Sequence, residues 1–413
     1  MTGPADPLRI GDVAVGGDGV AREASGRVVF VDGALPGELV RVETVGERRG
    51  HARAVVVDVV EPAPGRVAPP CPYVAAGCGG CGWQHATVAA QRDLRAGMVA
   101  EALTRLGGID GPRVDPGPTL PATGYRTTLR GVADAEGRFA LRRRHRHDPV
   151  AVPGCLVAHP RLAEVAAEGR FPPGATVTIR VGARTGDRMV VVDHDPDGSV
   201  AVEEAGDGAV AVPEGVRVVT GAELDGGKRA WLFEVVDGVR LRVSARSFFQ
   251  AGPDAAEALT AAVAAGLGDD PERGSLADLY GGVGLFAATV GRSYGRVIVV
   301  ESSASSCADA RVNLAAHAGA RVVRADVRRW RPRRVDAVVA DPPRSGLGKA
   351  GVRVVAGTRA RHVALVSCDA AALGRDTALL VGAGYRFDGS TLVDAFPHTP
   401  HVEVVTRFVR HPV

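Results

Sequence analysis

The 413-residue sequence has few lysines and asparagines. Lys228 and Lys349 are the only lysines among its 50 basic residues, and Asn313 is its only asparagine. We interpret this as a composition bias of the genome, which lowers the weight that any one arginine carries. The 50 basic and 47 acidic residues nearly balance at a formal net charge of +3, so overall charge does not indicate a partner.

Long hydrophobic runs are also lacking. No stretch of about 18 apolar residues occurs, which argues against a membrane-spanning helix and a membrane partner. The N-terminus lacks the basic start, apolar core and cleavage site of a signal peptide. We therefore expect a cytoplasmic location, where cysteines serve as ligands, nucleophiles or buried apolar residues rather than in disulfides. The six cysteines are Cys71, Cys78, Cys81, Cys155, Cys307 and Cys368.

The order of strand and helix patterns predicts an α/β protein with three regions. Residues 1–62 contain short strands between glycine-rich turns, which is typical of a small β-barrel. Residues 63–245 begin with a proline-rich linker and a helix at 87–106, which we expect to pack on the C-terminal region. An antiparallel β-rich part follows, with a turn at Asp195–Gly198. In residues 246–413, apolar strands alternate with helices, which predicts a mostly parallel, doubly wound sheet.

A glycine-rich loop, Asp278–Phe286, stands where a strand meets a helix. Its glycines permit a tight turn and let a ligand approach the backbone closely. The next strand ends at Glu301, an acidic residue suited to ribose hydroxyls. Because Gly282, Gly284 and Ala287 also satisfy G-x-G-x-x-A, the loop alone does not distinguish NAD from S-adenosylmethionine, and a purely structural turn is the alternative.

Two further motifs follow strands of the same region. The segment Asp341–Gly346 reads Asp-Pro-Pro-Arg-Ser-Gly. Its consecutive prolines make a stiff loop that could hold a planar base or an amino group, as in methyltransferases that act on nucleic acids or amines. In Ser367-Cys368-Asp369, a cysteine leaves the sheet at the same edge. The alternatives are a strand-ending turn and a small buried apolar residue.

Two segments outside these loops could complete a site. In Ser247–Gln250, two phenylalanines and an amide could stack on a base and hydrogen-bond it, or form a hydrophobic plug between domains. The segment Phe396–Glu403 precedes the last predicted strand and returns Glu403 to a sheet edge.

Three cysteines lie close together in the sequence, and a fourth lies far downstream. Cys71, Cys78 and Cys81 have spacings of x6 and x2, with Cys155 as the distant member. Four thiolates fit an iron–sulfur cluster or zinc, so we expect a metal centre. The absence of a compact Cys-x3-Cys-x2-Cys motif disfavours a radical S-adenosylmethionine enzyme.

Basic residues are concentrated at Arg142–His147, with Arg126, Arg130 and Arg138 nearby. A charge run is commonly a solvated surface. The density of this one favours contacts with the phosphates of a nucleic acid.

Taken together and in this order, the motifs resemble the RNA uracil-C5 methyltransferase family over nearly the whole chain. The likeness is to its iron–sulfur members, such as the 23S rRNA enzymes. It implies an OB-like TRAM β-barrel that binds RNA over residues 1–62 and a central β-rich domain over 63–245. A Rossmann-like class I methyltransferase domain is implied over 246–413. The implied cofactors are S-adenosylmethionine and a [4Fe–4S] cluster on Cys71, Cys78, Cys81 and Cys155.

The resemblance also implies roles for single residues. Cys368 matches the nucleophile, Glu403 the general base, and Asp341 the residue that helps hold the target uracil. The positions implied to bind the cofactor are Gln250, Asp278, Tyr280, Gly282, Gly284, Glu301, Asp326 and Asp341. Three positions depart from the family pattern: Gly281 replaces a cysteine, Gly252 an asparagine, and Asp369 the asparagine after the nucleophile.

The chemistry explains why such an enzyme needs a cysteine and a carboxylate. Uracil C5 is a poor nucleophile until a thiolate adds to C6, and the C5 proton must leave before the thiolate is expelled. An ordinary cysteine has a pKa of about 8.5, so we expect local stabilisation of the Cys368 thiolate. The target base must also be flipped out of its stack to be reached.

Other functions remain alternatives. An NAD-dependent oxidoreductase would leave the Asp341 loop, Cys368 and the basic run without a joint role. A non-catalytic RNA-binding factor would not need Cys368 together with Glu403. Methylation of adenine N6 or cytosine C5 is a closer alternative. Ribosomal RNA is favoured over transfer RNA, and a monomer is the default. The sequence does not identify the uridine, the oligomeric state or a further role of the cluster.

Overall fold

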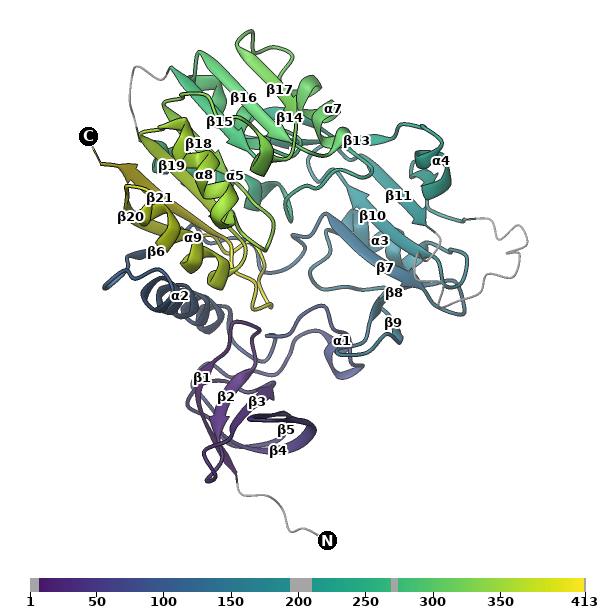
Figure 1. The fold of residues 1–413 in the computed structure, drawn as a ribbon. Coiled ribbons are helices and arrows are strands. Elements are labelled where there is room, and N and C mark those ends of the chain that lie inside the picture. The colour runs from purple at the N-terminus through teal and green to yellow at the C-terminus, as the bar shows by residue number, and fades with distance from the viewer. Residues whose placement is uncertain (1–6, 194–209, 269–273, 412–413) are drawn as a thin grey trace.

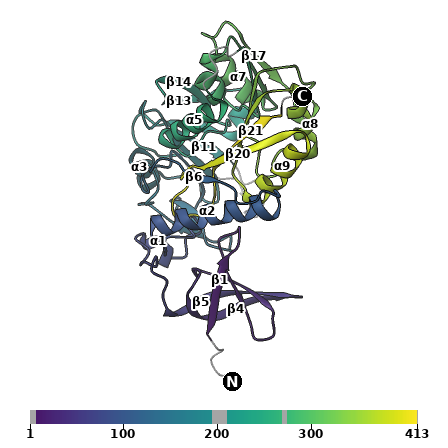
Figure 2. The ribbon, with the colours of Figure 1, turned by 90° about the vertical axis from the view of Figure 1, so that its left-hand side faces the viewer.

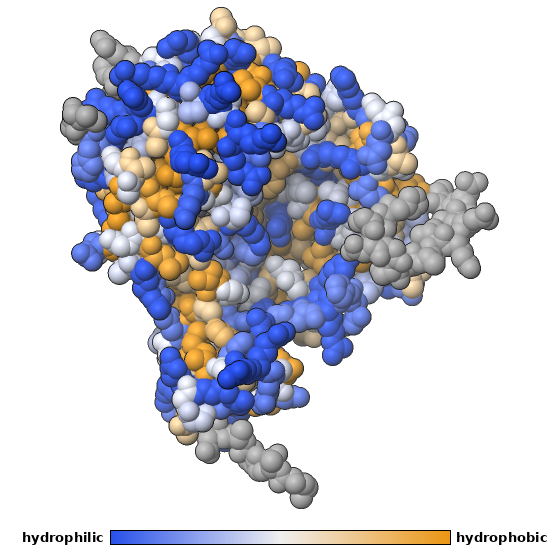
Figure 3. Space-filling view, viewed as in Figure 1, coloured by the Kyte–Doolittle hydropathy of each residue, from blue (hydrophilic) through white to orange (hydrophobic). Residues whose placement is uncertain are grey.

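The computed structural model describes residues 7–193, 210–268 and 274–411, and the turn expected at Asp195–Gly198 lies outside these ranges. The described chain forms a barrel, a central sheet and a large C-terminal sheet (Figure 1). The surface is hollowed between these three parts, with hydrophilic side chains around the rim (Figure 3). None of the helices in the described ranges has the length and apolar character needed to span a bilayer.

The N-terminal strands form a closed barrel in the order β1-β2-β3-β5-β4. Apolar residues that alternate along the strands, such as Val29 and Val31, point into its core. Closure removes the free strand edges that would otherwise pair with other chains. The strands are β1 Leu8–Val13, β2 Gly19–Arg22, β3 Val28–Asp32, β4 Leu39–Arg48 and β5 His51–Glu61.

The central part is a six-stranded sheet in the order β12-β11-β10-β7-β8-β9, followed by a separate hairpin, β13-β14. The antiparallel prediction holds for four of its pairings and is wrong for β11 and β12, which run parallel. The strands are β7 Thr128–Ala133, β8 Phe139–Arg142, β9 Pro149–Ala151, β10 Thr176–Val181, β11 Arg188–Asp193, β12 Arg217–Thr220, β13 Trp231–Val236 and β14 Val239–Ser244. The helices are α1 Pro72–Ala75, α3 Pro160–Glu168 and α4 Gly221–Asp225.

The C-terminal sheet has eight strands in the order β17-β16-β15-β18-β19-β21-β20-β6. The first five are parallel, and β21 runs antiparallel between β19 and β20. The outermost strand, β6, comes from the region predicted to be a second β-rich unit, so that prediction is wrong for residues 114–116. The strands are β6 Val114–Pro116, β15 Ser275–Leu279, β16 Arg296–Glu301, β17 Ala320–Arg324, β18 Ala337–Ala340, β19 His362–Ser367, β20 Tyr385–Leu392 and β21 Val404–Arg410.

Apolar cores lie on both faces of this sheet, because neighbouring strand residues such as Val338 and Val339 point to opposite sides. Helices α2, α8 and α9 contribute to one core, and α5 and α6 to the other. The prediction of a doubly wound sheet is therefore correct. The helices are α5 Pro253–Leu267, α6 Leu285–Ala288, α7 Ala304–Asn313, α8 Gly348–Thr358 and α9 Ala370–Gly382, with short 3-10 helices at Val290–Ser293 and Val327–Arg329.

Helix α2, Val88–Arg105, joins the barrel side of the molecule to the C-terminal sheet (Figure 2). The side chain of Thr87 caps it by accepting from Ala90 N. The helix packs closely on α9, where a Cβ on Gly374 would lie 2.5 Å from Ala102 O. Just before the helix, Trp83 Nε1 donates to Gly17 O of the barrel at 2.9 Å.

Candidate active site

The predicted cofactor and substrate residues follow the carboxyl ends of neighbouring parallel strands. Leu279 pairs in register with Val300 on one side and with Ala340 on the other. The residues just beyond these pairs therefore emerge at one edge of the sheet, where open α/β sheets bind ligands. These residues are Tyr280, Glu301 and Asp341.

Cys368 and Glu403 come together because β21 runs antiparallel to β19. Ser367 at the end of β19 pairs with Val404 at the start of β21. Cys368 is the next residue along one strand and Glu403 the residue before the other, so they flank this pair. The two side chains are close enough for the charge of Glu403 to raise the pKa of Cys368.

Gln250 connects the central part of the chain to this edge. Its Nε2 lies 3.4 Å from Asp341 Oδ2, and its side chain is buried. Of the two phenylalanines before it, Phe249 packs between two apolar cores, whereas Phe248 is 69% exposed. The plug interpretation therefore fits Phe249, and Phe248 is left free to contact a base.

A buried aspartate that the sequence did not reveal fixes this segment. Asp309 on α7 accepts from Ser247 Oγ at 2.6 Å and from Ser244 N at 2.8 Å. Arg242 Nε also donates to Asp309 at 2.7 Å, and Arg180 donates to Ser247 O at 2.8 Å. The segment that carries Gln250 is thus tied to the helix after β16.

Three residues of the glycine-rich loop have positive φ angles, a conformation that glycine adopts easily. Tyr280, Gly282 and Gly284 have φ angles of 59°, 52° and 84°, in the left-handed region. At Gly281, where the family usually has cysteine, an added Cβ would lie 2.7 Å from the Val299 side chain. Glycine in place of the family's cysteine at this position therefore lets the loop pack closely against β16.

Two carboxylates, Asp278 and Glu301, bond the backbone of this loop. Asp278 is fully buried; its Oδ2 accepts from Ala287 N at 3.0 Å, and its Oδ1 has no partner among the described residues. Glu301 accepts from Gly282 N at 3.1 Å and stays half-buried. An unpaired buried carboxylate oxygen calls for a donor. These residues therefore fit the ammonium, sulfonium and ribose groups of S-adenosylmethionine.

Asp326, one of the predicted cofactor-binding residues, lies beyond β17 and caps the 3-10 helix that follows. Its carboxylate forms an ion pair with Arg328 at 2.8 Å. That pair holds its pKa below the usual value. Asp326 stays half-buried, and its charge raises the pKa of Tyr280 after burial has done so, so these two predicted cofactor residues lie near each other.

Burial raises the pKa of three carboxyl groups of the site, those of Asp278, Asp341 and Glu403. The pKa of Asp278 and that of Asp341 rise to about 7, chiefly because burial penalises the charged form. The pKa of Glu403 is raised well above its usual value by burial and then by the charge of Asp341, and Arg344 opposes this rise. A cation bound near these carboxyl groups would lower their pKa values by favouring the charged forms.

The expected stabilisation of the Cys368 thiolate is wrong, because its surroundings favour the neutral thiol. The pKa of Cys368 rises to about 11, first because the thiol is half-buried and then because Glu403 and Asp341 are negative neighbours. Arg344 acts in the opposite direction. The same shift shows that Cys368, Asp341 and Glu403 lie within electrostatic reach of one another.

Aspartates on α9 hold the two loops that flank Cys368. Asp369, which replaces the family's asparagine, caps the helix by accepting from Ala372 N at 2.7 Å. Asp376 accepts from Leu347 N at 2.6 Å and Gly348 N at 2.9 Å, just after the Asp-Pro-Pro loop. Sequence reasoning did not assign Asp376 this role, because its partners are distant in the chain.

The third departure, Gly252, also has a structural reason. A Cβ at this position would lie 2.3 Å from Tyr125 O. The chain at 125–127 runs alongside here, and Thr127 N donates to Ala251 O at 2.9 Å. A larger residue would separate the two segments.

The four predicted metal ligands line one pocket, with apolar walls that include Leu129, Leu141 and Val152. Within the described ranges, no three His, Cys, Asp or Glu side chains are placed to hold a single metal ion. Burial raises the pKa of Cys78, Cys81 and Cys155, and other cysteines of the set raise those values further. Four thiols that line one pocket are the ligand type of an iron–sulfur cluster or of zinc.

The basic run lies against the loop that carries Cys78. Arg144 N donates to Gly77 O, and Gly79 N donates to Arg142 O, so the run pairs with the cysteine loop. The side chain of Arg144 pairs with Asp32 of the barrel at 2.5 Å. Other side chains of the run, including Arg142 and Arg146, are exposed and available to phosphates.

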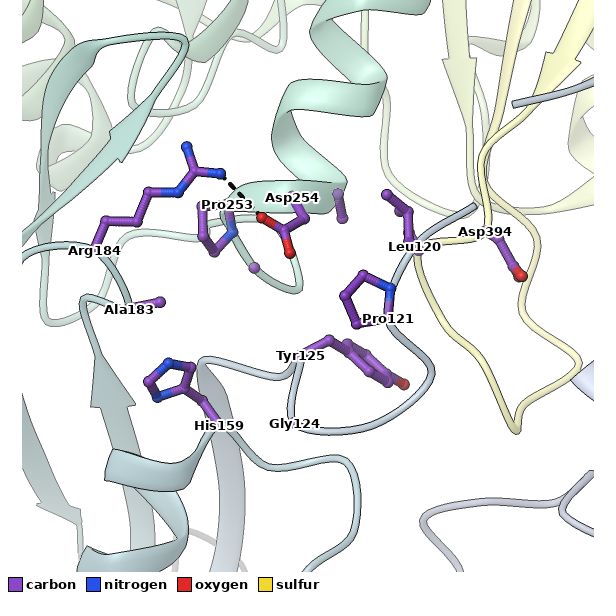
Figure 4. Close-up of a pocket in the computed structure, with 13 residues that line it drawn as sticks. Leu120, Pro121, Gly124, Tyr125, His159, Ala183, Arg184, Pro253, Asp254 and Asp394 are labelled. Carbon is purple, nitrogen blue, oxygen red and sulfur yellow. Dashed lines mark hydrogen bonds and ion pairs between the residues drawn. The ribbon is translucent and has the colours of Figure 1, made fainter. Parts of the chain in front are cut away.

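A cavity of about 220 Å³ lies elsewhere, at the start of α5 (Figure 4). Tyr125, Asp394 and the Arg184–Asp254 ion pair contribute to its walls. Its lining does not include Cys368, Asp341 or Glu403, so it is separate from the site described above.

Comparisons with known proteins identify the family. No family model matches the chain. An uncharacterized RNA methyltransferase of Streptomyces avermitilis is 38% identical and aligns over 96% of both chains. The 23S rRNA (uracil(1939)-C(5))-methyltransferase of Chromohalobacter salexigens is 32% identical over 98% of this chain and 90% of its own.

A solved structure shows the same fold. The tRNA (uracil-54, C5)-methyltransferase of Pyrococcus abyssi, in complex with S-adenosyl-L-homocysteine, matches 98% of this chain and all of its own, with a TM-score of 0.70 and 22% identity. The predicted α/β class I methyltransferase fold with an N-terminal barrel is thereby confirmed. The chain belongs to the family of RNA methyltransferases.

Proposed function

We propose that this protein transfers a methyl group from S-adenosylmethionine to C5 of a uridine in RNA. The observation that supports the proposal is the pairing of β19 with β21, in which Cys368 and Glu403 flank the Ser367–Val404 pair and lie within electrostatic reach of each other and of Asp341. A purely nucleotide-binding site would not need a thiol and a base at this place.

The proposed reaction uses three side chains. The Cys368 thiolate adds to C6 of the flipped uracil, and the C5 carbon that becomes electron-rich takes the methyl group while S-adenosylhomocysteine leaves with the electron pair of the broken S–C bond. Glu403 then takes the C5 proton, and the electron pair of that C–H bond expels the thiolate from C6. Asp341, which Gln250 holds, hydrogen-bonds the uracil edge. When bound, S-adenosylmethionine supplies the electrophilic methyl group and a positive charge that offsets the buried carboxylates.

We further propose that residues 1–62 act as a TRAM-like RNA-binding barrel, 63–245 as the central domain and 246–413 as the catalytic domain. In this proposal, Cys71, Cys78, Cys81 and Cys155 hold a [4Fe–4S] cluster that braces the central domain, consistent with the shared pocket. The protein acts as a monomer in the cytoplasm.

Ribosomal RNA is the favoured substrate. Relatives named as 23S rRNA enzymes match at 30–32% identity over nearly the full chain. Transfer RNA is the second candidate, because the solved structure with the same fold is named for that substrate.

Mass spectrometry of RNA from a deletion strain tests the function and separates these substrates. The strain should lose 5-methyluridine at one position of 23S rRNA and keep it in tRNA. Re-expressed native protein should restore it, and Cys368→Ala should not. Loss confined to tRNA would reverse the substrate assignment, and unchanged 5-methyluridine in both RNAs would overturn the function.

A further inference from the structure

The proposed base, Glu403, stands at the end of a segment, residues 396–403, that we call the base loop. The loop has no regular secondary structure, and His398 within it has a φ of 68° in the left-handed region. A non-glycine residue keeps such a conformation only when its surroundings hold it. The position of Glu403 therefore depends on what contacts the base loop.

Gln91 of α2 binds the backbone of the base loop. It is 0% exposed, and its Oε1 accepts from His398 N at 2.6 Å. Its Nε2 donates to Trp83 O at 3.0 Å and to Ala86 O at 2.8 Å. Trp83 N completes the arrangement by donating to His398 O at 2.9 Å. One buried amide thus links the start of α2, the cysteine segment and the base loop.

Arg95, one turn further along α2, binds the same loop. It is 1% exposed; one guanidinium nitrogen donates to Thr399 O at 2.7 Å, and another pairs with the buried Asp394. Burying an arginine is unfavourable unless its donors are used. Both of these acceptors lie in or just before the base loop.

Residues from other parts of the molecule also contact the base loop. Tyr125 OH donates to Pro397 O at 3.1 Å, and Arg126 stacks over Phe396. Gly17 of the barrel lies against Pro400, since a Cβ there would be 2.7 Å away. Cys368, by contrast, is carried by β19 and the capped start of α9.

We propose that Gln91 and Arg95 are positioning residues for Glu403. They fix the backbone of the base loop so that the carboxylate stands at C5 once the covalent adduct has formed. This inference rests on the proposed function. Its consequence is selective: loosening the loop slows loss of the C5 proton and release of the product, and leaves thiolate addition and methyl transfer nearly intact.

Gln91→Met and Arg95→Lys test this role. Gln91→Met keeps the volume and removes the hydrogen bonds. Arg95→Lys keeps the charge beside Asp394 and loses the planar fork that reaches Thr399 O as well. Each variant is mixed with the RNA on which the native protein turns over, and S-adenosylhomocysteine and protein–RNA adduct are followed in time.

We expect a first turnover within about threefold of the native rate, followed by a steady rate lowered about tenfold or more, with methylated adduct accumulating. Adduct formation with 5-fluorouridine RNA, which needs no proton removal, should stay within about threefold of native. Met98→Ala is the matched control, because Met98 is buried on the same helix in the core against the sheet. It should lower the melting temperature and leave the ratio of first to steady rate unchanged.

If Gln91→Met and Arg95→Lys slow the first and the steady turnover equally, so that the ratio of the two rates stays unchanged as in Met98→Ala, the positioning role is overturned. Native rates in both variants would also overturn it. If one variant does not fold, the other still decides. A native protein that forms no adduct with 5-fluorouridine RNA would instead overturn the proposed function, and this inference with it.

Discussion

At the scale of single residues, the site joins groups that are hard to ionise. Burial raises the pKa of the Cys368 thiol and of the Asp341 and Glu403 carboxyls. The charges of Glu403 and Asp341 raise the pKa of Cys368 further, and the charge of Asp341 raises that of Glu403. A cationic ligand would relieve this repulsion, so in the proposed mechanism the nucleophile becomes reactive when the cofactor is in place.

Glu403→Gln should separate the two halves of the reaction. The amide cannot take the C5 proton, so methylation proceeds and elimination stalls. We expect turnover to fall about 100-fold or more, and methylated RNA to stay bound to protein on denaturing gels. Normal turnover without adduct would show that Glu403 is not the base.

Asp278 should make stability depend on pH. Its pKa in the folded protein is about 7, above the ordinary value of 3.8 in the unfolded chain. The folded state therefore holds the proton more tightly, and this contribution is present below about pH 4 and lost as the pH rises toward 7. Between pH 5 and 8, the native protein should lose on the order of 2 kcal/mol more stability than Asp278→Asn in urea titrations. Equal losses would contradict the raised pKa.

At the scale of elements, the ends of the parallel strands could be predicted from the sequence. Buried parallel strands give continuous apolar runs, so the sequence indicated where Tyr280, Asp341 and Cys368 leave the sheet. It did not reveal β6, which has three residues and little burial of its own. Nor did it reveal Gln91 and Arg95, because polar residues on a helix normally face water, and only tertiary packing buries these two.

The N-cap of α9 tests the effect of Asp369, which stands where the family usually has asparagine. Asp369→Ala removes the cap of α9 and should cost about 1 kcal/mol of stability, whereas Asp369→Asn, which restores the family's residue, should cost only a few tenths. Urea titration measures both. A similar loss in the two variants would mean that the side-chain oxygen does not cap the helix.

At the scale of the whole molecule, distant parts of the chain converge on the base loop. Gly17 of the barrel, Trp83 of the cysteine segment and Tyr125 beside the central sheet all contact it. In the proposed function, the parts that bind RNA are therefore connected to Glu403, the proton-accepting group. Substitutions in the cysteine pocket should then change the position of Glu403 and lower activity.

The cysteine pocket can be tested by its metal. Protein purified without oxygen should absorb broadly near about 400 nm and contain iron and sulfide in equal amounts. Cys155→Ser should lose most of the iron and melt at a lower temperature, while Cys307→Ser, remote from the pocket, should keep it. Zinc in place of iron in the native protein would contradict the cluster.

The most direct measurement for the central claim is peptide mapping of the protein after reaction with S-adenosylmethionine and 5-fluorouridine RNA. Fluorine cannot leave as a proton does, so the reaction should stop at a methylated covalent adduct. We predict that the RNA fragment is attached to Cys368 and that Cys368→Ala yields none. An adduct on a different cysteine, or methyl transfer without any adduct, would contradict the mechanism.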